Sequence, residues 1–267
     1  MFSKLGYQGF ESAKNNVEAL TNSIENISNI NSVGYKKTQT TFTETLNGER
    51  IKQESKNFSQ GHLRRTGEVF DIALDGPGFF EVELSSGQRA YTRAGRLKLT
   101  NEGELVTDEG YKVVPQIEQS SQPLMQMIKG NNNALGVNLE VSTPKLIIPA
   151  NLTPEISDDG TISGINPQTG EKAKIGKINV AVFNNPQGLE SLGKGYYLET
   201  AASGQTLEAD ANSTKVKQGF LEFGNVDMVA ELMNISQLKG LITAQFKALK
   251  AIDKIYEQIH YTISKSV

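Results

Sequence analysis

Residues 10–27 have the sequence FESAKNNVEALTNSIENI. Their apolar side chains recur in alternating steps of three and four, which places them on one face of a helix; they are Phe10, Ala13, Val17, Leu20, Ile24 and Ile27. We expect this helix to run from about residue 3 to residue 29, before a segment rich in asparagine and serine that ends in Gly34. Because asparagine is a poor helix former, packing against another element has to stabilise the helix.

A second apolar stripe lies at the other end of the chain. It follows a similar grid and consists of Met228, Leu232, Ile235, Ile242, Phe246, Leu249, Tyr256 and Ile263. We expect this helix to begin near Asn225, a good N-cap, with Asp227 in the first turn, and to continue to about residue 264. Such a length is typical of a coiled coil. Two terminal helices that each need a partner indicate a subunit that assembles, and the alternative is a hairpin of the two helices within one chain.

The middle of the chain has the period of two that is typical of β-strands. From Gly67 onward, short alternating segments are separated by glycine or asparagine turns. We expect strands in ten places: 71–74, 80–84, 91–93, 97–99, 104–107, 111–114, 145–148, 161–163, 177–183 and 196–198. Residues 119–139 contain three consecutive asparagines and predict a loop. The fold class is therefore α+β, with long terminal helices forming a coiled-coil domain and a central all-β domain, an irregular barrel or rolled sheet.

These periods divide the chain into three parts. Residues 1–35 and 225–267 form the terminal helical domain, and residues 67–224 form the β-rich domain. Residues 36–66 are polar and charged with isolated apolar side chains, so they predict an extended arm between the two.

Composition excludes several classes of function. The 27 basic and 30 acidic residues nearly balance, which argues against a partner bound through a general basic field, so we expect no nucleic acid. The chain has no cysteine, which excludes disulfides, thiolate metal sites and cysteine nucleophiles. We find no apolar run long enough to span a bilayer and no cleaved secretory signal, so we expect no membrane insertion.

Catalytic chemistry is not indicated. The two histidines, His62 and His260, lie far apart in the sequence, so no serine triad or histidine-rich metal site is predicted. Asp158-Asp159-Gly160 contains part of a calcium-loop pattern, but the remaining ligand spacing is missing and a β-turn is the better interpretation. We therefore expect no catalytic residue, no metal and no cofactor.

Three groups of motifs remain. Asn26-Ile27-Ser28-Asn29-Ile30-Asn31-Ser32-Val33-Gly34-Tyr35-Lys36-Lys37 closes the first helix. Gly76-Pro77-Gly78-Phe79-Phe80, followed by Tyr91-Thr92-Arg93-Ala94-Gly95, lies in the β region. Gln218-Gly219-Phe220-Leu221-Glu222-Phe223-Gly224-Asn225-Val226 precedes the last helix. In this order the motifs resemble those of the bacterial flagellar basal-body rod and hook protein family, over nearly the whole chain.

The resemblance implies a structural subunit of the basal-body rod. The terminal helices would form the inner layer of a helical tube that transmits torque, and the β domain its outer wall. The implied partners are copies of the chain itself, other axial proteins of the rod and hook, and the flagellar type III export apparatus, which would export it without signal cleavage to the periplasm-spanning rod. The inner-layer contacts would come from Val17, Leu20, Ile24, Ile27, Leu232, Ile235, Ile242 and Leu249.

The chain departs from the family pattern at several positions. Glu25 stands where the family has the first asparagine of a pair, and Gly224 replaces a serine. Gly240 lies within the last helix, where it predicts a bend or altered packing. The length matches the FlgF and FlgG group of rod proteins, and the short arm favours a proximal-rod subunit. The alternatives are a cap or export-linked regulator with the same fold, and an extracellular binding module or enzyme.

Overall fold

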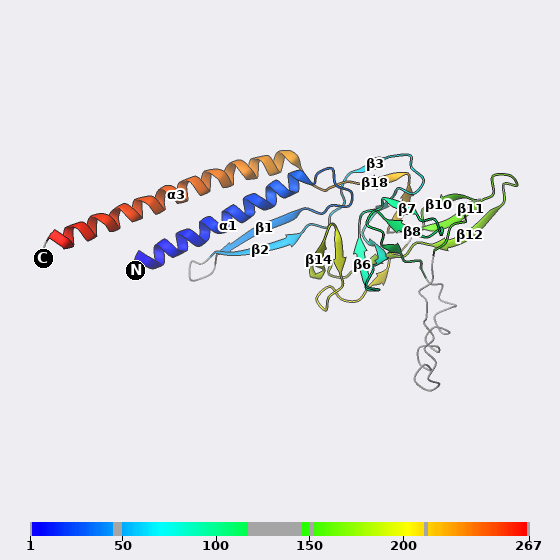
Figure 1. Ribbon diagram of the computed structural model, residues 1–267, viewed down its shortest axis with the longest axis horizontal. Coiled ribbons are helices and arrows are strands. Elements are labelled where there is room, and N and C mark those ends of the chain that lie inside the picture. Colours follow the sequence, from blue (N-terminus) through cyan, green and yellow to red (C-terminus); the bar gives the residue numbers. More distant parts are fainter. Residues whose placement is uncertain (1, 45–49, 117–145, 150–151, 211–212, 266–267) are drawn as a thin grey trace, which may run out of the picture. The chain divides into compact units, whose positions relative to one another are not determined.

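The computed structural model describes residues 2–44, 50–116, 146–149, 152–210 and 213–265 (Figure 1). The chain forms two compact units. The first, called the helical unit, comprises residues 1–31, 36–58 and 225–267. The second, called the β unit, comprises residues 32–35 and 59–224. Each is described by itself below.

The helical unit is built on two long helices. Helix α1, Phe2–Ser28, packs against helix α3, Met228–Lys265. They run antiparallel, because Asn26 near the end of α1 bonds Glu231 near the start of α3, and Asn16 bonds Gln245 further along. The two terminal helices pack together, and the residues between them in the sequence are rich in β-strands, which confirms the predicted α+β class. In this structure the two helices pair within one chain.

A β-hairpin completes the helical unit. Strands β1, Thr38–Glu44, and β2, Arg50–Lys56, pair antiparallel with Thr38 opposite Lys56, and β1 packs on α1. The sequence predicted only an extended arm over residues 36–66. These strands carry Thr, Gln, Glu and Lys with few apolar residues, so the apolar alternation that identified the other strands is missing here.

The start of α3 differs from the prediction. The side chain of Asp227, not Asn225, caps the helix, since its Oδ1 accepts the N–H groups of Val229 at 2.9 Å and Ala230 at 3.1 Å. Asn225 instead joins the two ends of the β-hairpin. Its Oδ1 accepts the N–H of Lys37 at 2.9 Å and its amide donates to the carbonyl of Asn57 at 2.8 Å.

The β unit is made of short strands. A nine-stranded sheet has the order β14-β15-β6-β5-β9-β8-β7, with β13 pairing with β5 and β16, and a three-stranded sheet has the order β10-β11-β12. Two further ladders pair β17 with β4 and β18 with β3. The bounds are β3 Leu63–Arg65, β4 Ile72–Asp75, β5 Phe79–Glu83, β6 Arg89–Thr92, β7 Leu97–Leu99, β8 Leu105–Thr107, β9 Lys112–Val113, β10 Thr153–Ile156, β11 Thr161–Ile165, β12 Lys172–Lys177, β13 Val180–Val182, β14 Glu190–Gly193, β15 Tyr196–Leu198, β16 Leu207–Glu208, β17 Lys215–Gln218 and β18 Phe220–Glu222.

The strand predictions were accurate where apolar alternation was clear, as at β4 to β9. Over residues 145–148, by contrast, the described part contains only an isolated bridge between Glu104 and Ile147. The predicted loop at 119–139 lies outside the described residues. The turn predicted at Asp158-Asp159-Gly160 is present, because the Gly160 N–H donates to the Ser157 carbonyl at 2.9 Å.

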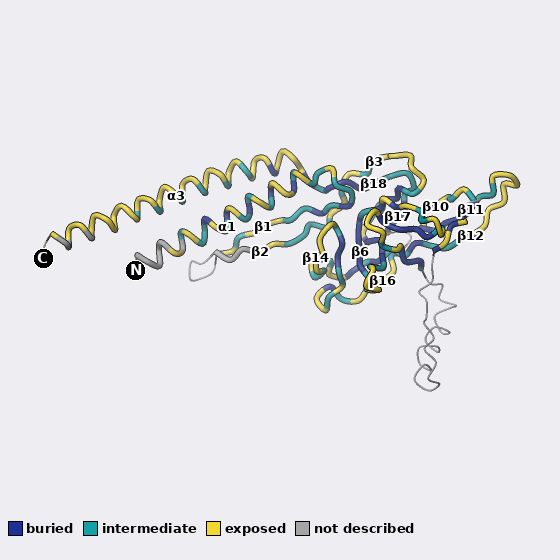
Figure 2. The backbone as a smooth tube through the Cα atoms, in the orientation of Figure 1, coloured by how far each residue is buried: buried dark blue, intermediate teal, exposed yellow. Residues whose placement is uncertain are grey.

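The core of the β unit collects the inward side chains of several ladders. Its members are buried and come from most of the strands, as the dark segments of Figure 2 show; they include Ile72, Leu74, Phe80, Leu97, Leu105, Val113, Ile148, Ile162, Ile178 and Val216. A second cluster consists of Val82, Ala90 and Tyr196. Burying one such side chain stabilises the fold by about 1.5–3 kcal/mol.

Candidate assembly surface and motif cluster

The seam between α1 and α3 is polar on the α1 side. Asn16 donates to Gln245 Oε1 at 3.0 Å, and Gln245 donates to Ser12 Oγ at 2.8 Å. Nearer the other end, the buried Asn26 donates to Glu231 Oε1 at 3.3 Å. Small residues let the helices approach closely, since a Cβ added to Gly9 would lie 3.2 Å from Leu249 Cδ2. Polar pairs in such a seam fix which register two helices adopt.

Helix α3 presents part of its apolar residues to this seam. The least exposed positions of α3 recur in steps of four and three; they are Glu231, Ile235, Leu238, Ile242, Gln245, Leu249 and Ile252. Three of the residues predicted to join subunits, Ile235, Ile242 and Leu249, thus face the helix of the same chain. The fourth on α3, Leu232, is 51% exposed.

Three large apolar residues of α1 lie outside the seam. Phe10, Val17 and Ile24 are spaced seven apart and are 58%, 43% and 50% exposed. We call these three residues the outer row. Leu20 and Ile27, also predicted as contact residues, are half-buried. Figure 2 shows that most of the length of α3 is exposed as well. The helical unit therefore leaves apolar surface uncovered on both helices.

Two asparagines of α1 bind the hairpin to this helix. The Asn26 amide donates to the Thr38 carbonyl and its Oδ1 accepts the Thr38 N–H, both at 2.9 Å. Asn22 donates to Thr40 Oγ1 at 3.0 Å and to Glu54 Oε1 at 2.7 Å. A single amide side chain at position 26 thus serves both the hairpin and the seam.

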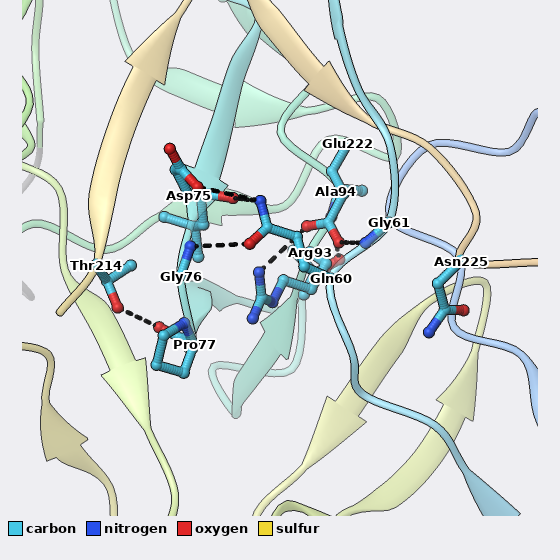
Figure 3. Close-up of polar contacts among 12 residues, drawn as sticks. Gln60, Gly61, Asp75, Gly76, Pro77, Arg93, Ala94, Thr214, Glu222 and Asn225 are labelled. Atoms are coloured by element: carbon cyan, nitrogen blue, oxygen red, sulfur yellow. Dashed lines mark hydrogen bonds and ion pairs between the residues drawn. The ribbon is translucent and has the colours of Figure 1, made fainter.

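The β unit contains a buried ion pair (Figure 3). Arg93 Nη1 is 3.2 Å from Glu222 Oε2, with side chains 3% and 0% exposed. Glu222 Oε1 also accepts the N–H of Gly61 at 2.8 Å. The Arg93 guanidinium lies 5.5 Å from the centre of the Phe79 ring. Burial lowers the pKa of Arg93, and the charge of Glu222 opposes this shift.

Two glycines of the motifs permit close backbone contacts. Gly34 has φ +69° and donates its N–H to the Glu222 carbonyl at 2.8 Å; a Cβ there would lie 2.3 Å from the Ala94 nitrogen. Gly76 has φ +129°, and a Cβ would lie 2.3 Å from the Ser213 carbonyl oxygen. Its N–H donates to the Gln60 side chain at 3.1 Å, as Figure 3 shows. No other residue type fits either site without moving the backbone.

The Gln218-Gly219 pair joins three segments of the β unit. The Gln218 amide donates to the Val69 carbonyl at 3.0 Å, and its Oε1 accepts the Ile156 N–H at 3.1 Å. Gly219, at φ +74°, donates its N–H to the Asp71 carbonyl at 2.7 Å. These two motif residues therefore connect separate segments of the fold by hydrogen bonds.

Comparison with known proteins finds several similar proteins. Residues 73–164 match the model of the flagellar hook protein FlgE/F/G D1 domain. A flagellar basal-body rod protein FlgG of Buchnera aphidicola subsp. Schizaphis graminum is 27% identical over 94% of the chain and 95% of its own length. The FlgG of Bacillus subtilis is 28% identical over 95% and 96%. The flagellar hook-basal body complex protein FlhP of B. subtilis is 27% identical over 82% of each chain.

Along nearly its whole length the chain is similar to proteins of the flagellar rod and hook family. The relatives that match over nearly the full length are basal-body rod proteins named FlgG. This is a family of structural proteins, which confirms the prediction that the chain is not an enzyme. No described helix is long and apolar enough to cross a membrane.

Most of the remaining residues of the rod and hook motifs are at least partly buried. After α1, Asn29 donates to the Glu25 carbonyl at 2.9 Å, Tyr35 is half-buried and Lys36 is buried, whereas Asn31 is exposed. Others pack in the interior; these are Gly78, Phe79, Phe80, Leu221 and Val226. Phe79 meets Phe183 and Tyr197 edge-on, with ring centres 5.9 Å apart in both pairs.

Among the residues that the structure describes, no group of three or more His, Asp or Glu side chains is placed to hold a metal ion.

The spacing of the apolar residues could not reveal the polar seam. The seam could have been found from a second row of small and polar residues on α1, each one position before a residue of the apolar stripe. This row consists of Gly9, Ser12, Asn16, Ala19, Ser23 and Asn26.

Proposed function

We propose that this protein is a wall subunit of the flagellar basal-body rod and that its terminal helices join it to neighbouring subunits in a helical tube that transmits torque. In this proposal residues 1–35 and 225–267 form the inner layer, residues 36–66 an arm beside it and residues 67–224 the outer wall. The neighbours are copies of the chain and other axial proteins, delivered by the type III export apparatus without signal cleavage.

One observation carries the proposal. The two helices already pair through one seam, yet the outer row of α1 and the residues Leu232 and Phe246 of α3 remain about half exposed. Exposed apolar surface of this extent on paired helices is typical of a protein that buries it against a partner. Burying each Leu, Ile or Phe would contribute about 1.5–3 kcal/mol per subunit contact.

Copy number tests the proposal. Quantitative mass spectrometry of purified hook–basal bodies would count this chain against the established rod and hook subunits. Several copies or more per basal body are expected of a wall subunit. One copy or a few would favour a cap or an export-linked regulator, and complete absence from intact basal bodies would exclude a place in the rod.

A further inference from the structure

We propose that the outer row of α1 packs antiparallel against the Leu232–Phe246 face of α3 in a second copy of this chain. This inference rests on the proposed function, and it specifies which faces meet between subunits. The contact is distinct from the seam inside the chain, which uses Asn16 and Gln245.

The two faces are free in the described part of the helical unit. On α1 the outer row is 43–58% exposed, and on α3 Leu232 and Phe246 are 51% and 49% exposed. At about 100° per residue, the outer row lies roughly 120° around α1 from the seam residues, and Leu232 and Phe246 lie roughly 90° around α3 from theirs. Each helix can therefore contact its partner in the chain and a helix of another copy at the same time.

Charge identifies the occupant as a second copy. On α1 an acidic row, Glu11, Glu18 and Glu25, follows the outer row at each next position. On α3 the exposed Lys247 and Lys254, also seven apart, form no ion pair within the described residues. Part of the acidic row is offset locally, because Glu18 has an interaction within its own chain and the charge of Glu25 acts on Lys56 of β2. The chain thus carries both halves of a complementary surface.

The positions of these charges favour antiparallel packing. The acidic row lies about 100° around α1 from the outer row, and the two lysines lie about 70° around α3 from Leu232 and Phe246, in the same rotational sense. When two helices run in opposite directions, charged rows displaced from the contact faces in the same rotational sense lie on the same side of the contact and can pair. The acidic row of α1 would then lie beside the lysines of α3. Since α1 and α3 are antiparallel within each chain, copies that share one polarity bring the helices together in this orientation.

This contact would propagate. It joins two different faces of the same molecule, so it is a heterologous contact, which produces a ring or an open helical array instead of a closed two-fold dimer. The proposed tube requires this kind of contact.

Cysteine cross-linking tests the inference, because the chain has no cysteine of its own. One tagged copy would carry Val17→Cys, and a second, differently tagged copy would carry Leu232→Cys, Lys239→Cys or Phe246→Cys. Both would be produced in flagellated cells, and isolated basal bodies would be treated with a short thiol cross-linker. The matched control is Ala248→Cys, which is exposed and lies on the opposite side of α3 from this face.

A product joining the two tagged copies at one or more of the three positions, and absent with Ala248→Cys, is expected. Cross-links only at Ala248, α1–α1 products, or a product with a different axial protein would overturn the inference. So would no product when both chains are present in the basal body, and this result would leave the proposed function intact. Absence of both chains from basal bodies would overturn the proposed function and the inference together.

Charge reversal gives a second test. Lys247→Glu with Lys254→Glu is expected to lower the number of copies per basal body on the order of tenfold. Glu11→Lys with Glu18→Lys in the same chain should restore most of the loss. If the acidic-row reversal does not restore assembly although circular dichroism shows intact helices, the charge rows do not meet and the inference fails.

Discussion

Arg93 and Glu222 form an ion pair 3.2 Å apart in which both side chains are buried. Glu222 belongs to the segment before the last helix, and Arg93 to a motif more than a hundred residues earlier. Glu222 also accepts the N–H of Gly61, and its own carbonyl accepts the N–H of Gly34. One residue thus joins four regions of the sequence, and the stability of the β unit should depend on it.

Removing one charge of this pair should be costly. Arg93→Met leaves a buried, uncompensated carboxylate, and we expect it to lower the free energy of unfolding by about 3–5 kcal/mol. Urea denaturation followed by tyrosine fluorescence measures this, since the chain has no tryptophan. As a control, Lys98→Met breaks the exposed pair with Asp108 and should cost under about 1 kcal/mol. Equal effects of the two substitutions would show that the buried pair has no special role.

Gly34 and Gly87 have similar φ angles, so alanine substitutions at these two positions distinguish backbone strain from steric collision. Gly87 has φ +79° and no atom within 4 Å of an added Cβ, so Gly87→Ala should cost only about 1–2 kcal/mol of left-handed strain. Gly34 has φ +69°, and its added Cβ would collide with the backbone at Ala94. Gly34→Ala should therefore destabilise the β unit clearly more than Gly87→Ala, measured as the shift in urea midpoint. A smaller effect at Gly34 would contradict the close approach.

The buried tyrosines predict a loss of stability at high pH. Burial raises the pKa of Tyr91 to about 12, and it raises the pKa values of Tyr196 and Tyr197 as well. Between the unfolded value of about 10 and the folded value, the folded chain binds more protons than the unfolded chain, so stability falls as pH rises. We expect the free energy of unfolding to decline from pH about 10 to 12. Tyr91→Phe should make this decline shallower, and an unchanged slope would contradict the assignment to Tyr91.

The polar seam should determine register more than stability. Asn16→Leu combined with Gln245→Leu replaces a polar pair by apolar side chains, so helix pairing should become tighter but less specific. Hydrogen exchange of α1 and α3, together with sedimentation of the free chain, would detect stronger protection and the appearance of alternative oligomers. If the double variant stays monomeric with the same protection pattern as the parent, the pair does not fix the register.

One substitution should disrupt assembly alone, and another should disrupt both assembly and the pairing of α1 with α3. Val17→Asp changes an exposed residue, so we expect it to abolish motility and remove the chain from basal bodies while circular dichroism remains unchanged. Leu249→Asp changes a seam residue beside Gly9, so it should also loosen the packing of α1 on α3. The β unit should stay folded in both variants. Full-length flagella built with Val17→Asp would exclude the outer row as a subunit contact.

The sequence by itself determined the two terminal helices and part of the strands. Periods of 3.6 and two identified α1, α3 and strands such as β4 and β5, because burial on one face imposes these spacings. The sequence also placed Gly34 at the end of the segment that follows the first helix, and this position tolerates no Cβ. The sequence did not reveal the hairpin of β1 and β2, whose residues are mostly polar and depend on amides such as that of Asn26.

Only the tertiary structure decided which face of α1 meets α3. Two grids of threes and fours lie side by side on this helix, and hydrophobicity alone favours the one that contains Phe10, Val17 and Ile24. The seam uses the other grid, because Asn16 finds Gln245 and Asn26 finds Glu231 across it. A buried polar group is stable only when its partner is present, and that partner lies more than two hundred residues away in the sequence.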